Sequence, residues 1–201
     1  MPAIDDHIAA GDQRLARGDL DGAELCYRKA YAINIRSANA LQSIGFVQMQ
    51  RGNFQTAIEW AQRAIEADPD YSLAYNLLGN ALLSLKRYEE ALEALPKGPN
   101  NSKPTIISLA INKALCYAGL GRWAEAEQEL RAVLEQEVTY ATRFAAVGMI
   151  SHEPMYADCH LILAYVLAHQ GNETESLLHD RLAHKMDPRV ALTPVAKAIL
   201  R

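Results

Sequence analysis

The sequence lacks the features that mark several large classes of protein. Aromatic residues make up only 7% of its 201 residues, although half of the chain is hydrophobic, which favours close helix packing over a β-sandwich core. No apolar run approaches the roughly 18 residues of a membrane-spanning helix. Lys and Arg form no cluster, and the net charge is −4. We therefore expect no nucleic-acid partner and no membrane insertion.

Cysteine is also scarce, with Cys26, Cys116 and Cys159 as the only copies. Their number is odd and no two of them form a CxxC pair, so reduced, buried thiols are expected. The N-terminal segment MPAIDDHIAAGD has neither the basic start nor the apolar stretch of a signal peptide. Together these absences predict a cytoplasmic location.

What the chain does contain is one repeated layout, which residues 41–69 show clearly. Two amphipathic segments flank the turn Gly52-Asn53, and Asp68-Pro69 ends the second segment. Equivalent turns lie at Gly18, Gly52, Gly121 and Gly171, and Lys86 holds the same place in a further copy. The copies begin at residues 4, 38, 72, 107 and 157, so three of their four spacings are 34 or 35 residues. This period, with two helices in each unit, is typical of tetratricopeptide repeats.

The residues at fixed places in each copy agree with that period. A small residue stands where the two helices of a unit should cross, at Gly11, Gly45, Gly79, Ala114 and Ala164. An alanine recurs on the second helix at Ala23, Ala57, Ala91 and Ala126, and a large apolar side chain follows the turn at Leu20, Phe54, Tyr88 and Trp123. On these residues the chain resembles a tetratricopeptide-repeat protein with five repeats over nearly its whole length.

The resemblance implies an all-α fold, a right-handed α-solenoid of antiparallel helix pairs that forms a single domain over residues 1–201. The expected parts are repeats at about 4–37, 38–71, 72–106, 107–140 and 157–188, an insert at 141–156 and a C-terminal capping helix at 189–201. Local signals refine the helix starts: Asp21 and Glu24 have capping-box spacing, and Asn53 is an expected N-cap. Thr193-Pro194 predicts a cap and first position for the last helix, and Pro154 predicts the first turn of the fifth copy.

Two stretches interrupt the repeat. Leu95-Pro96 should cut the second helix of the third copy short, and the segment PKGPNNSKP should then form a loop. About 16 extra residues within 135–153 carry apolar side chains at helical spacing, which favours a longer second helix. This excess either packs on the fifth copy or leans over the groove and gates it. The tail either caps the fifth copy or docks on a second molecule.

In proteins of this family the first helices line the concave side of the solenoid, so the resemblance implies a binding groove there. Helical periodicity identifies which residues share that face. The face is apolar and nearly uncharged, which marks a binding surface, and its asparagines can pair with any peptide backbone. The predicted partner-binding groove consists of Asn39, Gln42, Phe46, Met49, Leu73, Asn76, Leu77, Asn80, Leu83, Ile111, Asn112, Leu115, Ile162 and Tyr165.

These features predict a non-catalytic scaffold or adaptor that binds a hydrophobic or amphipathic segment of a partner protein. The alternatives are a dedicated chaperone for an aggregation-prone secreted or membrane protein, and a structural protein that assembles with itself through residues 189–201. Some family members hold a carboxylate with cationic side chains on this face. The corresponding places here are Ile8, Asp12, Ser43, Leu73 and Leu77, so a carboxylate would be desolvated without a partner.

Catalytic and metal-binding patterns are weak. His179 and His184 are five residues apart and His152 and His160 are eight apart, so neither pair has the i, i+4 spacing of a helical zinc site. Cys159 and His160 are adjacent, which points their side chains apart. The sequence therefore predicts no enzyme activity, no metal and no cofactor.

Overall fold

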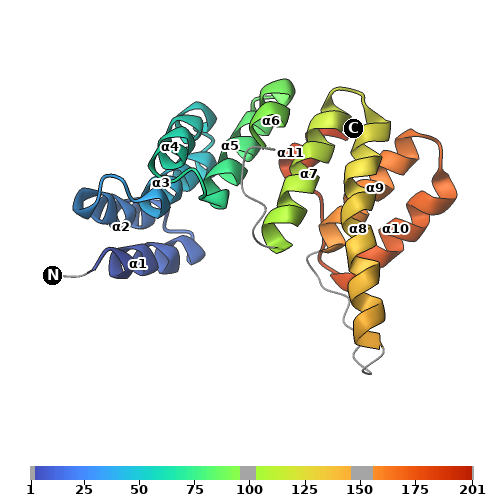
Figure 1. Ribbon diagram of the computed structural model, residues 1–201, viewed down its shortest axis with the longest axis horizontal. Helices are drawn as coiled ribbons and strands as arrows, with labels where there is room; N and C mark the ends of the chain where they lie inside the picture. Colours follow the sequence, from blue (N-terminus) through green and yellow to red (C-terminus); the bar gives the residue numbers. More distant parts are fainter. Residues whose placement is uncertain (1–2, 96–102, 146–155, 201) are drawn as a thin grey trace. The chain divides into compact units, whose positions relative to one another are not determined.

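The computed structural model describes residues 3–95, 103–145 and 156–200, with the backbone alone for 103–105 and 136–145. Contacts divide the chain into two compact units, unit 1 (Met1–Pro99) and unit 2 (Asn100–Arg201). The boundary falls inside the proline-rich segment PKGPNNSKP. We describe each unit by itself, and Figure 1 shows the path of the chain through both.

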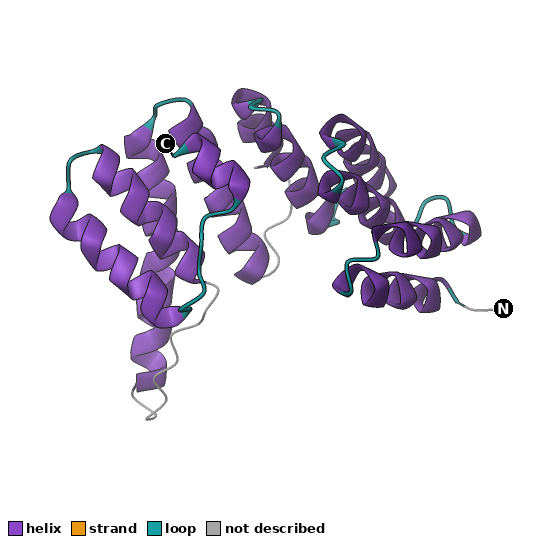
Figure 2. Cartoon of the chain, turned by 180° about the vertical axis from the view of Figure 1, so that it is seen from behind, coloured by secondary structure: helices purple, strands orange, loops and turns teal. Residues whose placement is uncertain are grey.

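The described residues form helices and no strand, so the all-α prediction is confirmed (Figures 1 and 2). Unit 1 contains three antiparallel pairs, α1 (Ile4–Ala16) with α2 (Leu20–Ile33), α3 (Ala38–Gln50) with α4 (Phe54–Ala67), and α5 (Ser72–Ser84) with α6 (Tyr88–Ala94). Unit 2 contains α7 (Lys103–Gly119) with α8 (Trp123–Ala145), α9 (Ala157–His169) with α10 (Glu173–Met186), and the single helix α11 (Pro194–Ile199). Four of the five pairs begin at the residue that the repeat register predicts, and α7 begins four residues earlier than predicted.

The turn inside each pair depends on one residue in the left-handed backbone region. Gly18, Gly52, Gly121 and Gly171 have φ between 72° and 80° there, and Lys86 has φ 58°. Glycine adopts this conformation without steric cost, whereas a residue with a Cβ atom does not. The repeat register predicts that Lys86 takes the glycine position, and its positive φ confirms this. Its backbone is strained there, whereas the glycines of the other copies adopt the same conformation without strain.

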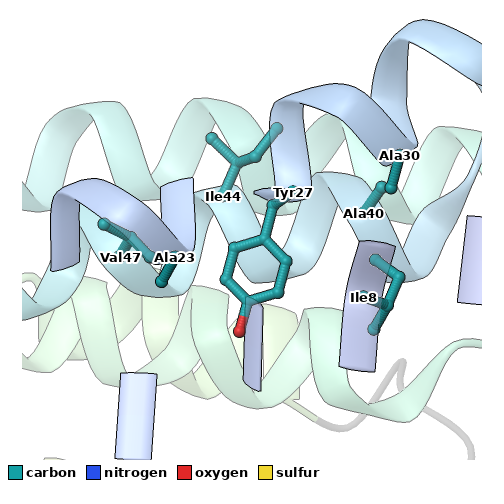
Figure 3. Close-up of a cluster of buried hydrophobic side chains, with 7 residues drawn as sticks. All are labelled: Ile8, Ala23, Tyr27, Ala30, Ala40, Ile44 and Val47. Carbon is teal, nitrogen blue, oxygen red and sulfur yellow. The ribbon is translucent and has the colours of Figure 1, made fainter. Parts of the chain in front are cut away.

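The helices of a pair cross closely because the crossing residue is small. A Cβ atom on Gly11 would lie 2.3 Å from the ring of Tyr27, and one on Gly45 would lie 2.9 Å from Cβ of Trp60. Tyr27 is 1% exposed and lies at the centre of the core that α1, α2 and α3 share (Figure 3). The small residue therefore fixes how tightly each pair packs.

The capping box predicted for the start of α2 is wrong, and the N-cap predicted for α4 is confirmed in its position but makes no side-chain capping bond. The N-cap of α2 is Asp19, whose side chain accepts a hydrogen bond from the Gly22 amide at 2.9 Å, so Asp21 and Glu24 form no capping box. Asn53 occupies the N-cap position of α4, but its amide donates to the side chain of Gln48 instead. The predicted cap of the last helix is confirmed, since Thr193 accepts from the Ala196 amide and Pro194 is the first residue of α11.

The irregular stretches are helical as far as they are described. Helix α6 ends at Ala94 after 7 residues, as Pro96 predicts, whereas α4 has 14. Helix α8 continues to Ala145, which confirms the longer second helix. Residues 146–155 of the predicted insert, which include Pro154, lie outside the described residues, and Tyr156 is the N-cap of α9. All three cysteines are buried thiols.

Candidate functional site

The first helices of successive pairs carry the predicted groove residues, and we call the surface that these residues form the first-helix face of each unit. In unit 1, Asn39 and Leu73 are exposed and Leu77 and Leu83 are buried. The other predicted residues, Gln42, Phe46, Met49, Asn76 and Asn80, are half-buried. The exposed fraction of Leu73 is 48%. Apolar and amide side chains are thus accessible together on this face.

Leu77 owes its burial to packing between first helices. Its Cδ2 atom lies 2.7 Å from the position that a Cβ atom on Gly45 would occupy, so it fills the space that this glycine leaves between α3 and α5. Leu77 is therefore a packing residue and contributes little to a surface that a ligand could reach.

The amides on this face are held in place by their own helix. The Asn80 side chain donates to the Asn76 carbonyl at 2.9 Å, and Asn39 accepts from the Ser43 hydroxyl at 3.3 Å. Because these bonds use one nitrogen and one oxygen, each amide retains a second group that can pair with a ligand. Preoriented side chains lose less freedom when a ligand binds.

The first-helix face of unit 2 is more covered. Asn112, Leu115 and Ile162 are buried, Ile111 is half-buried, and only Tyr165, at 42%, is exposed. The side-chain nitrogen of Asn112 is buried without a hydrogen-bond partner in the part of the chain that the structure describes. An unpaired buried amide costs about 1–3 kcal/mol, which marks this position as unusual.

The tail of the chain packs against other helices of unit 2. Helix α11 contacts α7, and Figure 2 shows the tail crossing unit 2 to reach it. His169, the last residue of α9, donates from Nε2 to the carbonyl oxygen of Leu200 at 2.8 Å. The His169 ring in turn stacks on Trp123, with 4.2 Å between the centroids. The tail thus reaches the last pair at His169, but its helix packs on α7, one pair earlier than the cap of the fifth copy that the sequence predicted.

Two charged groups near the faces have partners within the protein. Asp12, at one of the places where a carboxylate-binding relative would need a cation, accepts a hydrogen bond from Tyr27 at 2.8 Å. Burial, and this bond to Asp12, raise the pKa of the Tyr27 hydroxyl well above its usual range. Lys113 is half-buried on α7 and lies 3.6 Å from Glu129 on α8, so its charge is compensated within the pair.

The contact between two histidines was not predicted from the sequence. His160 and His179 face each other across α9 and α10, with 2.7 Å between their Nδ1 atoms. The repeat register could have found them, because the same two positions in the second pair hold Leu41 and Trp60, which belong to one hydrophobic cluster. Among the described residues no group of three or more His, Cys, Asp or Glu could hold a metal. We interpret the two histidines as a polar substitute for an apolar contact between helices.

A membrane-crossing segment is also not found: in the described ranges, no helix combines enough length with enough apolar character to span a bilayer.

Two family profiles match successive parts of the chain. Residues 16–98 match the anaphase-promoting complex, cyclosome, subunit 3 profile, and residues 111–190 match a tetratricopeptide-repeat profile. The fold defines the class, an all-α solenoid of helix pairs. Within that class, the chain is a tetratricopeptide-repeat protein.

Curated relatives match over part of their length. The chain is 36% identical over 90 residues to small glutamine-rich tetratricopeptide repeat-containing protein 2 of Mycosarcoma maydis, covering 45% of this chain and 26% of that protein. It is 27% identical over 144 residues to the Hsp70-Hsp90 organising protein of Plasmodium falciparum, covering 72% of this chain and 55% of that protein. The chain thus spans between about a quarter and about half of these relatives.

Solved structures share the fold over almost the whole chain. PilF of Pseudomonas aeruginosa superposes with a TM-score of 0.76 at 21% identity, covering 96% of this chain and 79% of that chain. A thermophilic TPR protein of Thermus thermophilus superposes with a TM-score of 0.70 at 22% identity, covering 93% of both chains. At these identities the likeness concerns the fold alone.

Proposed function

We propose that the chain is a non-catalytic scaffold that binds a hydrophobic or amphipathic segment of a partner protein on its first-helix face. The observation that carries this proposal is the state of that face in unit 1, where Leu73 is 48% exposed and Phe46 and Met49 are half-buried. Large accessible apolar side chains on a folded protein favour a protein partner.

The amides Asn39, Asn76 and Asn80 give this face a second property. They can pair with backbone groups of a bound segment whatever its sequence. The apolar side chains favour large apolar residues in that segment. The relatives support a scaffold as well, since one is named an Hsp70-Hsp90 organising protein. A carboxylate clamp is not proposed, because Asp12 and Leu73 stand where such a site needs cations.

The test uses random peptides of about 15 residues, long enough for four helical turns, displayed on phage and selected against the full-length chain. Affinities of selected peptides are then measured by fluorescence anisotropy. Leu73→Glu should weaken binding by at least about tenfold, because the carboxylate is desolvated against apolar side chains of the ligand. Phe46→Glu should have the same effect.

The matched control is Leu25→Glu. Leu25 is 56% exposed on α2, a second helix, and so receives the same substitution away from the first-helix face. It should leave affinity unchanged. Equal losses for Leu73→Glu and Leu25→Glu, with unchanged circular dichroism, would reject the first-helix face of unit 1 as the binding surface.

A further inference from the structure

The geometry points to α11 as an internal ligand: it occupies a helix-binding surface on unit 2 that a partner helix of the same pattern takes over. This inference deepens the proposed function, on which it rests, by naming the kind of partner that unit 2 fits.

The buried residues of the tail define that pattern. Leu192, Ala196 and Leu200 are 8%, 1% and 3% exposed and follow one another at intervals of four residues. Lys197 and Ala198, between the last two of them, are exposed. The buried side of the tail therefore reads Leu-x3-Ala-x3-Leu, in which Leu192 precedes the N-cap, Ala196 lies in α11 and Leu200 is the C-cap.

The tail depends on unit 2 for its helical form. Helix α11 has only 6 residues, and an isolated helix of that length is not stable in water. Its cap at Thr193 and its contact with α7 compensate for the short length. A segment that folds only against a surface behaves as a bound peptide does.

The end of the tail is held by a contact that a competing helix could also make. His169 donates to the main-chain carbonyl of Leu200 rather than to a side chain, and every helix ends in carbonyl groups without partners inside the helix. The surface thus recognises a helix end and an apolar stripe, which a partner segment with this pattern would present equally well.

Attachment to the same chain favours the internal ligand. A short tether gives an effective concentration of about millimolar order, so a free peptide of the same sequence should bind the wild-type chain poorly. The probe is a fluorescein-labelled peptide of residues 189–201, added to the full-length chain.

Ala196→Glu in the chain should release its own tail, because no space exists for the larger side chain, and expose the surface to the labelled peptide. We expect this variant to bind the peptide at least about tenfold more tightly than the wild-type chain does. The matched control, Ala198→Glu, places the same substitution on the exposed side of α11 and should bind the peptide as weakly as the wild type. A labelled peptide carrying Ala196→Leu should bind poorly to every chain.

Release of the tail can be followed separately through Trp123. In a Trp60→Phe background Trp123 is the remaining tryptophan, and it stacks on the histidine that bonds Leu200. Its emission should change in Ala196→Glu and not in Ala198→Glu. If Ala196→Glu fails to fold, a protease site placed at the exposed residues 188–189 allows the tail to be cut after folding, and the cut chain should exchange its tail for the labelled peptide.

The inference is overturned if neither the folded Ala196→Glu chain nor the cut chain takes up the peptide better than the wild type. It is also overturned if light scattering finds the wild-type chain dimeric and the dimer is lost on cutting, since the tails would then be exchanged between copies. Because the peptide assay reports on unit 2 and the Leu73→Glu assay on unit 1, the failure of one proposal leaves the other measurable.

Discussion

The first-helix faces of the two units are built from the same kind of helix pair and differ in how exposed their side chains are. In unit 1 Leu73 is 48% exposed, Asn39 is exposed, and Gln42, Asn76 and Asn80 are half-buried. In unit 2 Leu115 and Ile162 are buried, and the tail of the chain contacts α7 and His169. The same repeat thus gives a more exposed first-helix face in unit 1 than in unit 2.

The sixth position of the repeat is buried in several copies, but its burial has different consequences in them. Leu77, Asn112 and Ile162 are the sixth residues of the third, fourth and fifth copies in the predicted register, and all three are buried. The two apolar ones lose nothing by burial, whereas the amide of Asn112 loses a hydrogen bond to water that the described residues do not replace. A substitution at Asn112 can therefore show whether this polar side chain lowers the stability of the fourth pair.

The largest effect is expected from Asn112→Leu. Replacing the unpaired amide with a side chain of similar size, as in the third copy, should raise the free energy of unfolding of unit 2 by about 1–2 kcal/mol. Urea unfolding followed by Trp123 emission measures it. Asn76→Leu, at a half-buried position of unit 1, is the control and should change stability little. A less stable Asn112→Leu chain would mean that the amide has a partner in the folded protein.

A smaller effect concerns the ion pairs that join α2 to the end of α3 in unit 1. Partial burial alone would raise the pKa of Glu24, but the hydrogen bonds from Arg51 and Arg28 outweigh it and hold the pKa below its ordinary 4.5. A depressed pKa stabilises the fold above 4.5, and the stabilisation is lost as the pH falls through the folded value.

Glu24→Gln should therefore lower the free energy of unfolding by about 1 kcal/mol at pH 7. The difference from the wild type should shrink as the pH falls below 4.5. Urea titrations at a series of pH values measure it, with Glu59→Gln at an exposed position of α4 as the control. A difference that is constant with pH would show that the ion pairs are not its source.

The smallest effect is expected at the turn of the third pair. Lys86→Gly should stabilise unit 1 by about 0.5–1 kcal/mol, because glycine adopts the positive φ without strain. Thermal unfolding measures the change. Gly52→Ala, the reverse substitution one copy earlier, should destabilise by a similar amount. If both substitutions lower the melting temperature, the turn at Lys86 gains from its side chain more than it loses in backbone strain.

Much of the fold could be predicted because its signals are local. The positive-φ turns at Gly52 and Gly171 and the small crossing residues at Gly11 and Gly45 act within one pair, and the period repeats them. Details that depend on competition between neighbouring donors were harder to predict, and Asn53 bonds Gln48 rather than its own helix end. The facing of His160 and His179 could have been predicted from the register of Leu41 and Trp60, although not from the spacing of histidines alone.

The sequence by itself determined the helix pairs, their turns and the apolar character of the first-helix face, because helical periodicity and turn geometry depend on residues a few positions apart. Only the tertiary structure decided which residues of that face are buried. Leu77 is buried because it fills the space that Gly45 leaves between α3 and α5, and the contact of α11 with α7 joins segments far apart along the chain. Such packing depends on the shape of neighbouring helices and not on residues a few positions apart.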